Sequence, residues 1–191
     1  TDSDGVNFIS EWSNSQALNG IYYLSYAPAA GTILNMQFLG NCDLGLLGVV
    51  TQCWQSMHAN EAKYGLQAQS IIFGLSRGTS YDPNLLFSYR TAAAGDYEVK
   101  LAFSCPQCGN PDSKFPSNGL FVSVLAGVTP LSGDPVCKQF VIDPSSKTLS
   151  CTVHLNANDF VSVYLDNNGQ SNYDYGSFSE ARIIPSAASS I

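Results

Sequence analysis

Few side chains in this sequence could act as a catalytic nucleophile, base or acid. There are two histidines: His58 lies in a polar stretch, and His154 lies between Val153 and Leu155 in an expected strand. A Ser-His-Asp triad needs a base held against an activated hydroxyl, and no Gly-x-Ser-x-Gly turn accompanies either histidine. Both histidines are therefore expected to face solvent.

A glycosidase would need two carboxyl groups on either side of the scissile bond. The chain has four glutamates, and two of them, Glu98 and Glu180, alternate with Lys100 and Arg182. This spacing predicts surface ion pairs, which contribute little stability. Most aspartates lie in turns, where the side chain caps the local backbone. The sequence therefore favours a protein that is not an enzyme, and a hydrolase is the less favoured alternative.

The six cysteines form an even set, which in an exported protein indicates three disulfides. Cys137 and Cys151 are symmetric about Pro144, in two stretches expected to form a hairpin, so we predict Cys137–Cys151. Cys42–Cys53 would close a glycine-rich loop, and Cys105–Cys108 follows by elimination. The Cys105-Pro106-Gln107-Cys108 motif could instead be redox-active or bind zinc. It lies among prolines and glycines, however, and no second Cys-x-x-Cys accompanies it.

Two segments rich in Asp and Asn could bind Ca²⁺, which prefers oxygen ligands on flexible loops. One contains Asp2 and Asp4, and the other contains Asp166, Asn168 and Asp174. Neither matches the EF-hand loop, and such turns commonly form without a metal. The sequence therefore predicts no cofactor, and Ca²⁺ is the one ion to be considered.

Aromatic residues make up 12% of the chain and supply candidates for a binding surface. Phe160 and Tyr164 alternate with Val161, Val163 and Leu165, so they are predicted to point away from the core. A flat exposed ring can stack on a sugar or anchor a protein interface. Trp12 and Trp54 are expected in the core or as loop plugs. The candidate contact residues are Tyr22, Tyr23, Tyr26, Phe160, Tyr164, Tyr173 and Tyr175.

Apolar and polar residues alternate with a period of two, which is typical of half-buried strands. The clearest strands are expected at 97–103, 120–125, 160–165 and 177–184. Further strands are expected at 20–26, 32–39, 70–74, 85–91, 136–142 and 148–155, with a short helix or ordered loop at 55–64. Turn residues separate them at the spacing of a sandwich. We therefore predict an all-β chain forming one two-sheet antiparallel β-sandwich domain over residues 1–191, with residues 1–10 and 185–191 as terminal arms.

Four segments with turn and strand residues follow one another in an order that can be compared with known modules. Arg90–Val99 leads through an Ala-Ala-Ala-Gly turn into a strand, and Asn118–Val124 follows a long loop. Leu155–Val163 contains an Asn-Ala-Asn-Asp turn, and Asp166–Phe178 leads into the last strand. This succession, over about residues 85–184, resembles jelly-roll modules of exported bacterial proteins that are often grouped with carbohydrate-binding modules. The resemblance implies a jelly-roll sandwich in an extracellular setting and, by analogy, glycan binding.

Charge and hydropathy exclude several partners. The formal net charge is −7 and the eight Lys and Arg residues are scattered, which argues against nucleic acid and anionic membrane surfaces. No apolar run approaches the ~20 residues of a spanning helix, so no membrane insertion is expected. Only 12% of residues are charged, about half the usual ~25%. A surface of low charge suits burial between neighbouring subunits.

The favoured interpretation is a non-catalytic structural or adhesive subunit, secreted or at the cell surface. The chain begins at Thr1 and is expected to be a processed product. Copies of it would assemble into a filament, appendage or surface layer through sheet faces and terminal segments such as 6–10 and 181–191. The alternative is a secreted carbohydrate-binding module that uses exposed aromatic residues to hold a polysaccharide. A jelly-roll glycan hydrolase or lyase is less favoured.

Overall fold

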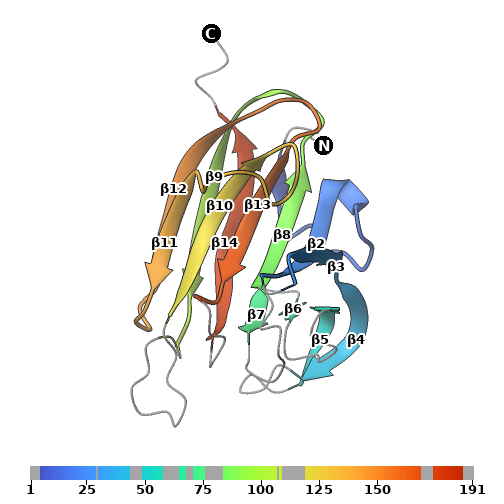
Figure 1. Cartoon of the computed structure of the whole chain (residues 1–191), viewed down its shortest axis with the longest axis vertical. Helices are drawn as coiled ribbons and strands as arrows, with labels where there is room; N and C mark the ends of the chain where they lie inside the picture. The colour runs from blue at the N-terminus through green and yellow to red at the C-terminus, as the bar shows by residue number, and fades with distance from the viewer. Residues whose placement is uncertain are drawn as a thin grey trace.

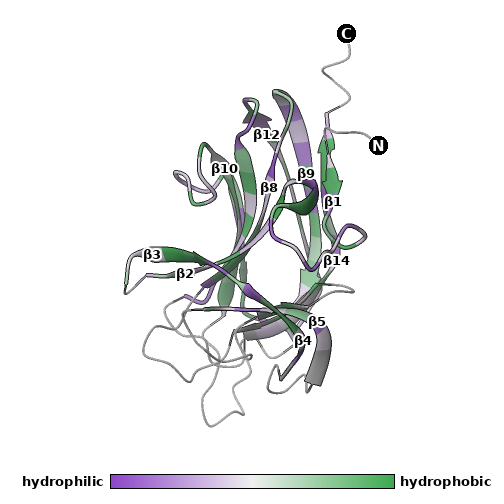
Figure 2. Cartoon of the chain, turned by 90° about the vertical axis from the view of Figure 1, so that its right-hand side faces the viewer, coloured by the Kyte–Doolittle hydropathy of each residue, from purple (hydrophilic) through white to green (hydrophobic). Residues whose placement is uncertain are grey.

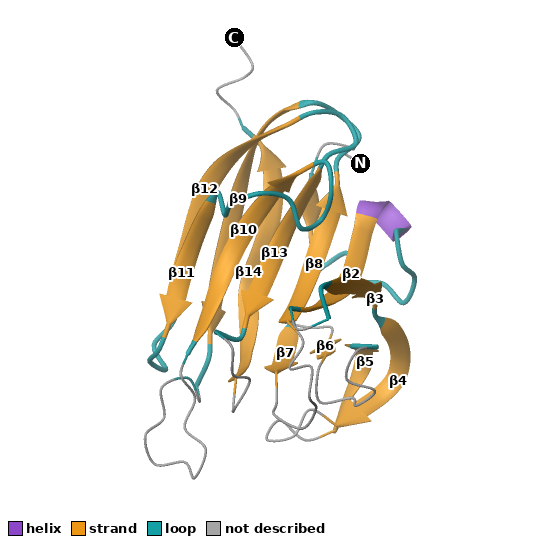
Figure 3. Cartoon of the chain, in the orientation of Figure 1, coloured by secondary structure: helices purple, strands orange, loops and turns teal. Residues whose placement is uncertain are grey.

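The computed structural model describes residues 5–28, 30–43, 49–57, 65–67, 71–75, 84–106, 108, 119–168 and 174–186. These residues form two antiparallel β-sheets, sheet A and sheet B, that pack face to face (Figures 1 and 3). One short 3-10 turn, Leu18–Gly20, precedes the first long strand. No helix in the described segments has the length and apolar character needed to cross a membrane.

Sheet B has six strands in the order β11-β10-β13-β8-β2-β3. The strands are β2 (Ile21–Ala27), β3 (Thr32–Asn35), β8 (Asn84–Arg90), β10 (Leu120–Gly127), β11 (Cys137–Val141) and β13 (Phe160–Asp166).

Sheet A has eight strands in the order β12-β9-β14-β7-β6-β5-β4, and β1 also pairs with β14. The strands are β1 (Val6–Asn7), β4 (Gln37–Asp43), β5 (Val49–Gln55), β6 (Gly65–Gln67), β7 (Ile72–Leu75), β9 (Gly95–Ser104), β12 (Lys147–Leu155) and β14 (Asp174–Pro185).

The chain path confirms the predicted jelly-roll sandwich. From β8 onward, successive described strands alternate between the two sheets, except at the β10–β11 hairpin within sheet B. Each strand therefore contributes one face to the shared core and one face to the outside. The predicted alternation is observed in β9, where Tyr97, Val99, Leu101 and Phe103 are buried and the residues between them are half-buried.

Aromatic rings join the two sheets inside the sandwich. Phe87 of β8 meets Phe178 of β14 edge to face, with centroids 5.4 Å apart. Tyr23 of β2 stacks on Trp54 of β5 at 4.4 Å and 14°. Aromatic pairs of this kind add about 0.5–1.5 kcal/mol beyond the burial of their area. Trp54 is buried and Trp12 packs against the core, as the sequence predicted.

The predicted pairing of Cys137 with Cys151 is present, but the predicted hairpin is wrong. Cys137 lies in β11, which pairs with β10 in sheet B, whereas Cys151 lies in β12, which pairs with β9 in sheet A. The intervening turn therefore carries the chain from one sheet to the other, and the disulfide links the two sheets at their edge. Spacing symmetric about a turn fits such an arch as well as it fits a hairpin.

The remaining cysteines follow the predicted scheme as far as the structure describes them. Cys105 is bonded to Cys108. Cys53 is also disulfide-bonded, whereas the side chain of Cys42, its expected partner, lies outside the described side chains.

Two segments differ from the expected elements. The single strand expected at 32–39 is divided into β3 and β4, because the chain turns at buried Met36 from sheet B to sheet A. The expected N-terminal arm is docked from residue 5 onward, since Val6 and Phe8 are buried in the core. Most of 55–64, expected as a short helix or loop, lies outside the described residues, as do residues 1–4 and 187–191.

Candidate functional site

The outer face of sheet A is hydrophilic. Lys100 lies 3.7 Å from Glu98, and Arg182 lies 2.9 Å from Glu180, which confirms the two ion pairs expected from the sequence. His154 Nδ1 lies 2.8 Å from Asp96 in an exposed pair, also as predicted for a solvent-facing histidine. His58 lies outside the described residues. This face offers charges that are already paired.

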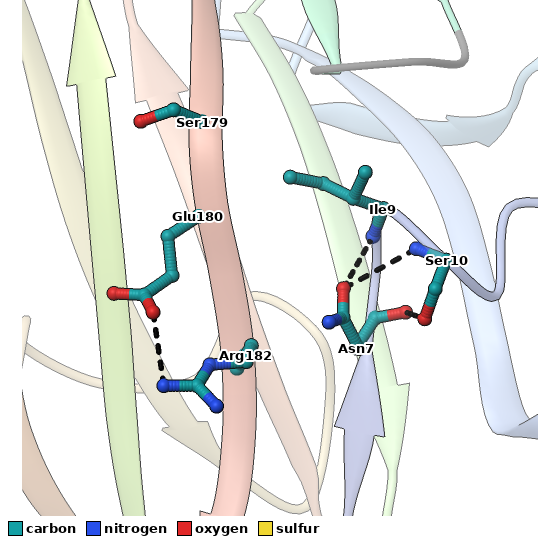
Figure 4. A pocket seen from close by; sticks show the side chains of 6 residues that line it. All are labelled: Asn7, Ile9, Ser10, Ser179, Glu180 and Arg182. Carbon is teal, nitrogen blue, oxygen red and sulfur yellow. Dashed lines mark hydrogen bonds and ion pairs between the residues drawn. The ribbon is translucent and has the colours of Figure 1, made fainter.

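A pocket of about 390 Å³ opens on this face between β14 and the turn after β1 (Figure 4). Asn7 Oδ1 accepts hydrogen bonds from the backbone N–H groups of Ile9 and Ser10, at 3.0 and 3.2 Å. Arg182 is held by Glu180, although its buried Nε has no partner among the described residues. The pocket has no aromatic lining, and its polar groups mostly serve the local fold. Its lining residues are Asn7, Ile9, Ser10, Ser179, Glu180 and Arg182.

The outer face of sheet B is aromatic. Antiparallel register places Tyr164 of β13 opposite Ser123 of β10, and Phe121 opposite Asp166. Buried leucines on this face do not belong to the main core cluster and form a second, thinner apolar layer; they are Leu24, Leu86 and Leu125. The half-buried aromatic residues of the face are Tyr22, Tyr26, Phe121, Phe140, Phe160 and Tyr164.

A hollow of about 220 Å³ lies on this face, and we call it the sheet B hollow. Three adjacent strands, β11, β10 and β13, form its floor, and the loop between β10 and β11 forms one wall. It brings together aromatic rings, a hydroxyl, an ammonium and a carboxylate. Its lining residues are Phe121, Ser123, Leu125, Leu131, Gly133, Pro135, Lys138, Tyr164 and Asp166.

The loop at residues 128–136 is fixed against the sheet by specific contacts. Ser162 Oγ donates a hydrogen bond to the Pro130 carbonyl at 2.7 Å, and Ser88 Oγ lies 2.6 Å from Ser162 Oγ. At the loop's start, a Cβ added to Gly127 would lie only 2.5 Å from Ser132 Cβ, so this close approach requires glycine. The wall of the hollow is thus a built part of the fold.

Tyr164 is held in place by Asn84 of the neighbouring strand β8. Asn84 Nδ2 donates a hydrogen bond to the Tyr164 hydroxyl at 2.7 Å, and Asn84 Oδ1 accepts one from the Asn167 N–H at 2.9 Å. Burial raises the pKa of Tyr164 above its ordinary value, and the nearby Asp166 carboxylate adds to the effect. The phenol therefore stays protonated at neutral pH and can donate a hydrogen bond.

Lys138 and Phe121 form the other side of the hollow. The Lys138 ammonium lies 4.8 Å from the centroid of the Phe121 ring, and Phe121 packs on Phe140 with centroids 4.7 Å apart. A cation over a ring in this way contributes about 0.5–1 kcal/mol at exposed sites. Lys138 is in none of the ion pairs formed by the described residues, so its charge can meet a ligand.

Other aromatic candidates divide between the surface and the core. Phe160 and Tyr22 contact each other edge to face at 5.5 Å, on the same face as the hollow but outside it. Tyr26 is half-buried on that face. Tyr23, by contrast, points into the core, because neighbouring residues of a strand face opposite ways. Tyr175 is buried within β14 rather than exposed in a loop, and Tyr173 lies outside the described residues.

Of the five predicted Ca²⁺ ligands, only Asp166 and Asn168 have described side chains. The Asn168 N–H donates to Asp166 Oδ1 at 2.9 Å, which is the local capping of a turn. Asp2, Asp4 and the side chain of Asp174 lie outside the described part. No group of three or more His, Cys, Asp or Glu residues able to hold a metal occurs in the part that is described.

Sequence reasoning missed Lys138, Ser123 and the covering loop. Phe121 and Ser123 carried a signal, because they alternate with Leu120, Val122 and Val124 and so had to face outward. The run Thr129-Pro130-Leu131-Ser132-Gly133 marks a loop, but nothing local shows that it folds back over the sheet.

No protein-family model matches the chain, and no curated protein does. Solved structures are similar at a distance. The K2 cleaved adhesin domain of Lys-gingipain is 13% identical with a TM-score of 0.47, over 95% of this chain and 99% of that one. The K3 cleaved adhesin domain from Porphyromonas gingivalis is 13% identical with a TM-score of 0.39, over 65% of this chain and 72% of that one.

A third similar structure contains the CBM22-1 and GH10 modules of the Clostridium thermocellum endo-1,4-beta-D-xylanase 10B, complexed with xylohexaose. The two chains are 9% identical with a TM-score of 0.37, over 59% of this chain. This chain spans 23% of the length of that xylanase chain. All three similarities are remote, so they carry no argument about the function of this chain.

Proposed function

We propose that this protein is a non-catalytic extracellular binding module that holds a carbohydrate chain on the outer face of sheet B. The observation that carries the proposal is the sheet B hollow, where Phe121 and Tyr164 lie beside Ser123, Lys138 and Asp166. Sites for small ligands combine an apolar lining with a few well-placed polar groups. Among the side chains that the structure describes, the hydrophilic face of sheet A has no comparable combination.

The chemistry of the hollow suits a sugar ring. A sugar presents C–H groups on its faces and hydroxyl groups around its rim. The Phe121 and Tyr164 rings can cover a face, while Ser123, Lys138 and Asp166 can hydrogen-bond the rim. A lining with both an ammonium and a carboxylate favours a neutral sugar, and the net charge of −7 disfavours a polyanion.

The size of the hollow indicates how much of a chain it holds. At about 220 Å³ it is smaller than the roughly 300–1,000 Å³ of pockets for drug-sized ligands. It therefore suits one ring at a time, and the rest of a polysaccharide would lie along the aromatic face toward Phe160 and Tyr22.

The proposed extracellular location and the proposed non-catalytic role each have separate support. The Cys105–Cys108 and Cys137–Cys151 disulfides favour an oxidising compartment. Glu98 and Glu180 are occupied by ion pairs on the face opposite to the sheet B hollow, so they do not form a carboxylate pair within it.

Retention on insoluble polysaccharides tests the proposal. Tyr164→Phe keeps the ring but removes the hydroxyl, Tyr164→Ala removes both, and Lys138→Ala removes the cation. The matched control is Lys100→Ala on the outer face of sheet A. We expect Tyr164→Ala and Lys138→Ala each to weaken retention at least about tenfold, which is about 1.4 kcal/mol, and Lys100→Ala to have no effect. A wild-type protein retained by no polysaccharide, or equal losses in both lysine variants, would reject it.

Self-association is a second candidate role. It is favoured by strand β3 at the end of sheet B, whose four residues are exposed and uncharged. The terminal segments considered from the sequence are less suited to it. Val6 and Asn7 pair with Ile183 and Arg182 of the same chain, so these parts are already used within sheet A.

A further inference from the structure

Among the strands that the structure describes, β3 leaves one edge of sheet B open. It pairs with β2 on one side and is the last strand of the sheet, and all four of its residues are exposed. Ile33 and Leu34 are 40% and 42% exposed, large values for aliphatic side chains. Figure 2 shows β2 and β3 extending sideways from the sandwich, with β3 coloured as hydrophobic.

The hydrogen-bond pattern shows which main-chain groups face the open edge. The Met36 N–H donates to the Tyr23 carbonyl at 2.9 Å, so Met36 directs its main-chain groups toward β2. Successive residues of a strand alternate in this respect. Leu34 therefore also faces β2, whereas Ile33 and Asn35 direct their N–H and C=O groups outward.

The open edge lacks the charge that usually blocks strand pairing. The strands at the three other ends of the two sheet orders each contain a charged residue, which is Lys138 in β11, Lys147 in β12 and Asp43 in β4. The two-residue β1, which pairs with β14 beside this order, contains none. Strand β3 contains none. In the sequence, no charged residue occurs from Trp12 to Cys42, although the net charge of the chain is −7. Two copies of the chain carry the same net negative charge and repel each other at their charged surfaces, but their β3 edges can approach because they carry no charge.

We propose that β3 is a homodimer interface, in which β3 of a second copy pairs with it in antiparallel fashion about a two-fold axis perpendicular to sheet B. Such an axis requires one residue to lie opposite itself. With Leu34 at the centre, Ile33 lies opposite Asn35 of the second copy, and each such pair exchanges both outward-facing main-chain hydrogen bonds. The two Leu34 side chains meet on the axis.

The alternative centre is weaker. With Ile33 opposite itself, Asn35 would lie opposite Gly31, whose φ of +66° takes it out of the extended strand. The hydrogen bonds of that pair would be lost. The pattern of the edge therefore selects Leu34 as the centre of the pairing between two copies.

The dimer has a consequence for binding that rests on the proposed function. A two-fold axis perpendicular to the sheet keeps the outer faces of both copies on the same side. Both sheet B hollows would then face one polysaccharide surface, and joining two sites can raise avidity by about 10²–10⁴. The dimer itself does not depend on this ligand.

Sedimentation velocity over about a hundredfold range of concentration tests the dimer, since self-association follows mass action. Ile33→Lys places a charge on the edge, and Asn35→Pro removes an outward N–H without removing a bond to β2. The control is Ile142→Lys, at a 50% exposed isoleucine near β11. We expect a concentration-dependent dimer in the wild type and in Ile142→Lys. In both β3 variants its dissociation constant should rise at least about tenfold.

Three results would overturn the proposal: a wild type that stays monomeric, a dimer unaffected by both β3 variants, or equal losses in Ile142→Lys. Thermal unfolding of each variant shows whether its fold is retained. On a polysaccharide that retains the wild type, Ile33→Lys should lower retention while leaving the affinity for a soluble oligosaccharide of the same sugar unchanged. A loss of both would contradict bivalent binding, and a protein that dimerises but binds no sugar would refute the proposed function alone.

Discussion

Replacing Gly127 by alanine tests how the loop at 128–136 shapes the sheet B hollow. Gly127 is the last residue of β10, and the loop returns directly above it. The added Cβ would lie 2.5 Å from Ser132 Cβ and 2.7 Å from Ser132 Oγ. Carbon atoms in contact prefer about 3.5–4.0 Å, so the loop must move by at least about 1 Å.

The Ser132 side chain cannot rotate away from the added Cβ without losing hydrogen bonds. Its Oγ accepts a hydrogen bond from the Thr129 N–H at 2.9 Å and donates one to the Thr129 carbonyl at 2.7 Å. Overpacking of this kind costs about 1–3 kcal/mol. Replacing glycine reduces the entropy of the unfolded chain, which returns about 0.4–1 kcal/mol. We expect a net destabilisation of about 1–2 kcal/mol and a displaced wall containing Leu131 and Pro135.

Urea unfolding measures the change, as a lower midpoint with an unchanged slope. Gly40→Ala is the matched control, because Gly40 also lies in a strand but no atom lies within 4 Å of its added Cβ. This variant should be as stable as the wild type or slightly more stable. Retention on polysaccharide should fall in Gly127→Ala alone. If both variants have the stability and retention of the wild type, the loop is not packed as described.

Three further predictions concern other features. Replacing Cys137 and Cys151 by serine should cost about 3 kcal/mol in urea unfolding, since their separation of 14 closes a loop of about 15 residues; a negligible loss would contradict a link between sheets. Hydrogen bonds from Ser145 lower the pKa of Asp143 to about 2, below its unfolded value of about 3.9. The stability that the Asp143 carboxylate adds is present above about pH 4 and is lost as the pH falls toward 2. The urea midpoint of Asp143→Asn should therefore decline less than that of the wild type in this pH range. An equal decline in both proteins would refute this role. Burial raises the pKa of Tyr164, so Tyr164→Phe should remove one tyrosine that ionises well above about pH 10 in an absorbance titration. Because the unfolded phenol ionises at a lower pH than the folded one, this variant should also lose less stability above about pH 10 than the wild type does.

Strand positions were predictable because burial of one face selects apolar residues at every second position. The expected strand at 97–103 lies within β9, and the one at 160–165 lies within β13. The same alternation correctly placed Phe160 and Tyr164 on the outside. The alternation also places Tyr22 and Tyr26 on the opposite face of the strand from Tyr23. Grouping the three tyrosines as one cluster overlooked this difference.

Changes of sheet were not predictable from the local pattern. The residues before and after Met36 are extended in both strands, so the turn from sheet B to sheet A leaves no mark in the alternation. The spacing of Cys137 and Cys151 fixed their pairing but not their sheets, because a hairpin and an arch bring two such residues equally close.

The candidate site was predictable only in part, because it depends on long-range strand order. Tyr164 and Asp166 were both singled out from the sequence, the first as a contact residue and the second as a metal ligand. Lys138 joins them because β11 and β13 both lie beside β10, at register positions that only the assembled sheet defines.

Mapping the bound sugar by NMR tests the central claim most directly. The backbone amide signals of the wild type would be followed while a soluble oligosaccharide of a retained polysaccharide is added. Binding at the sheet B hollow predicts that the largest shifts occur at Phe121, Ser123, Lys138 and Tyr164. Shifts centred on Lys100 and Arg182 of the outer face of sheet A, or no shifts at all, would contradict it.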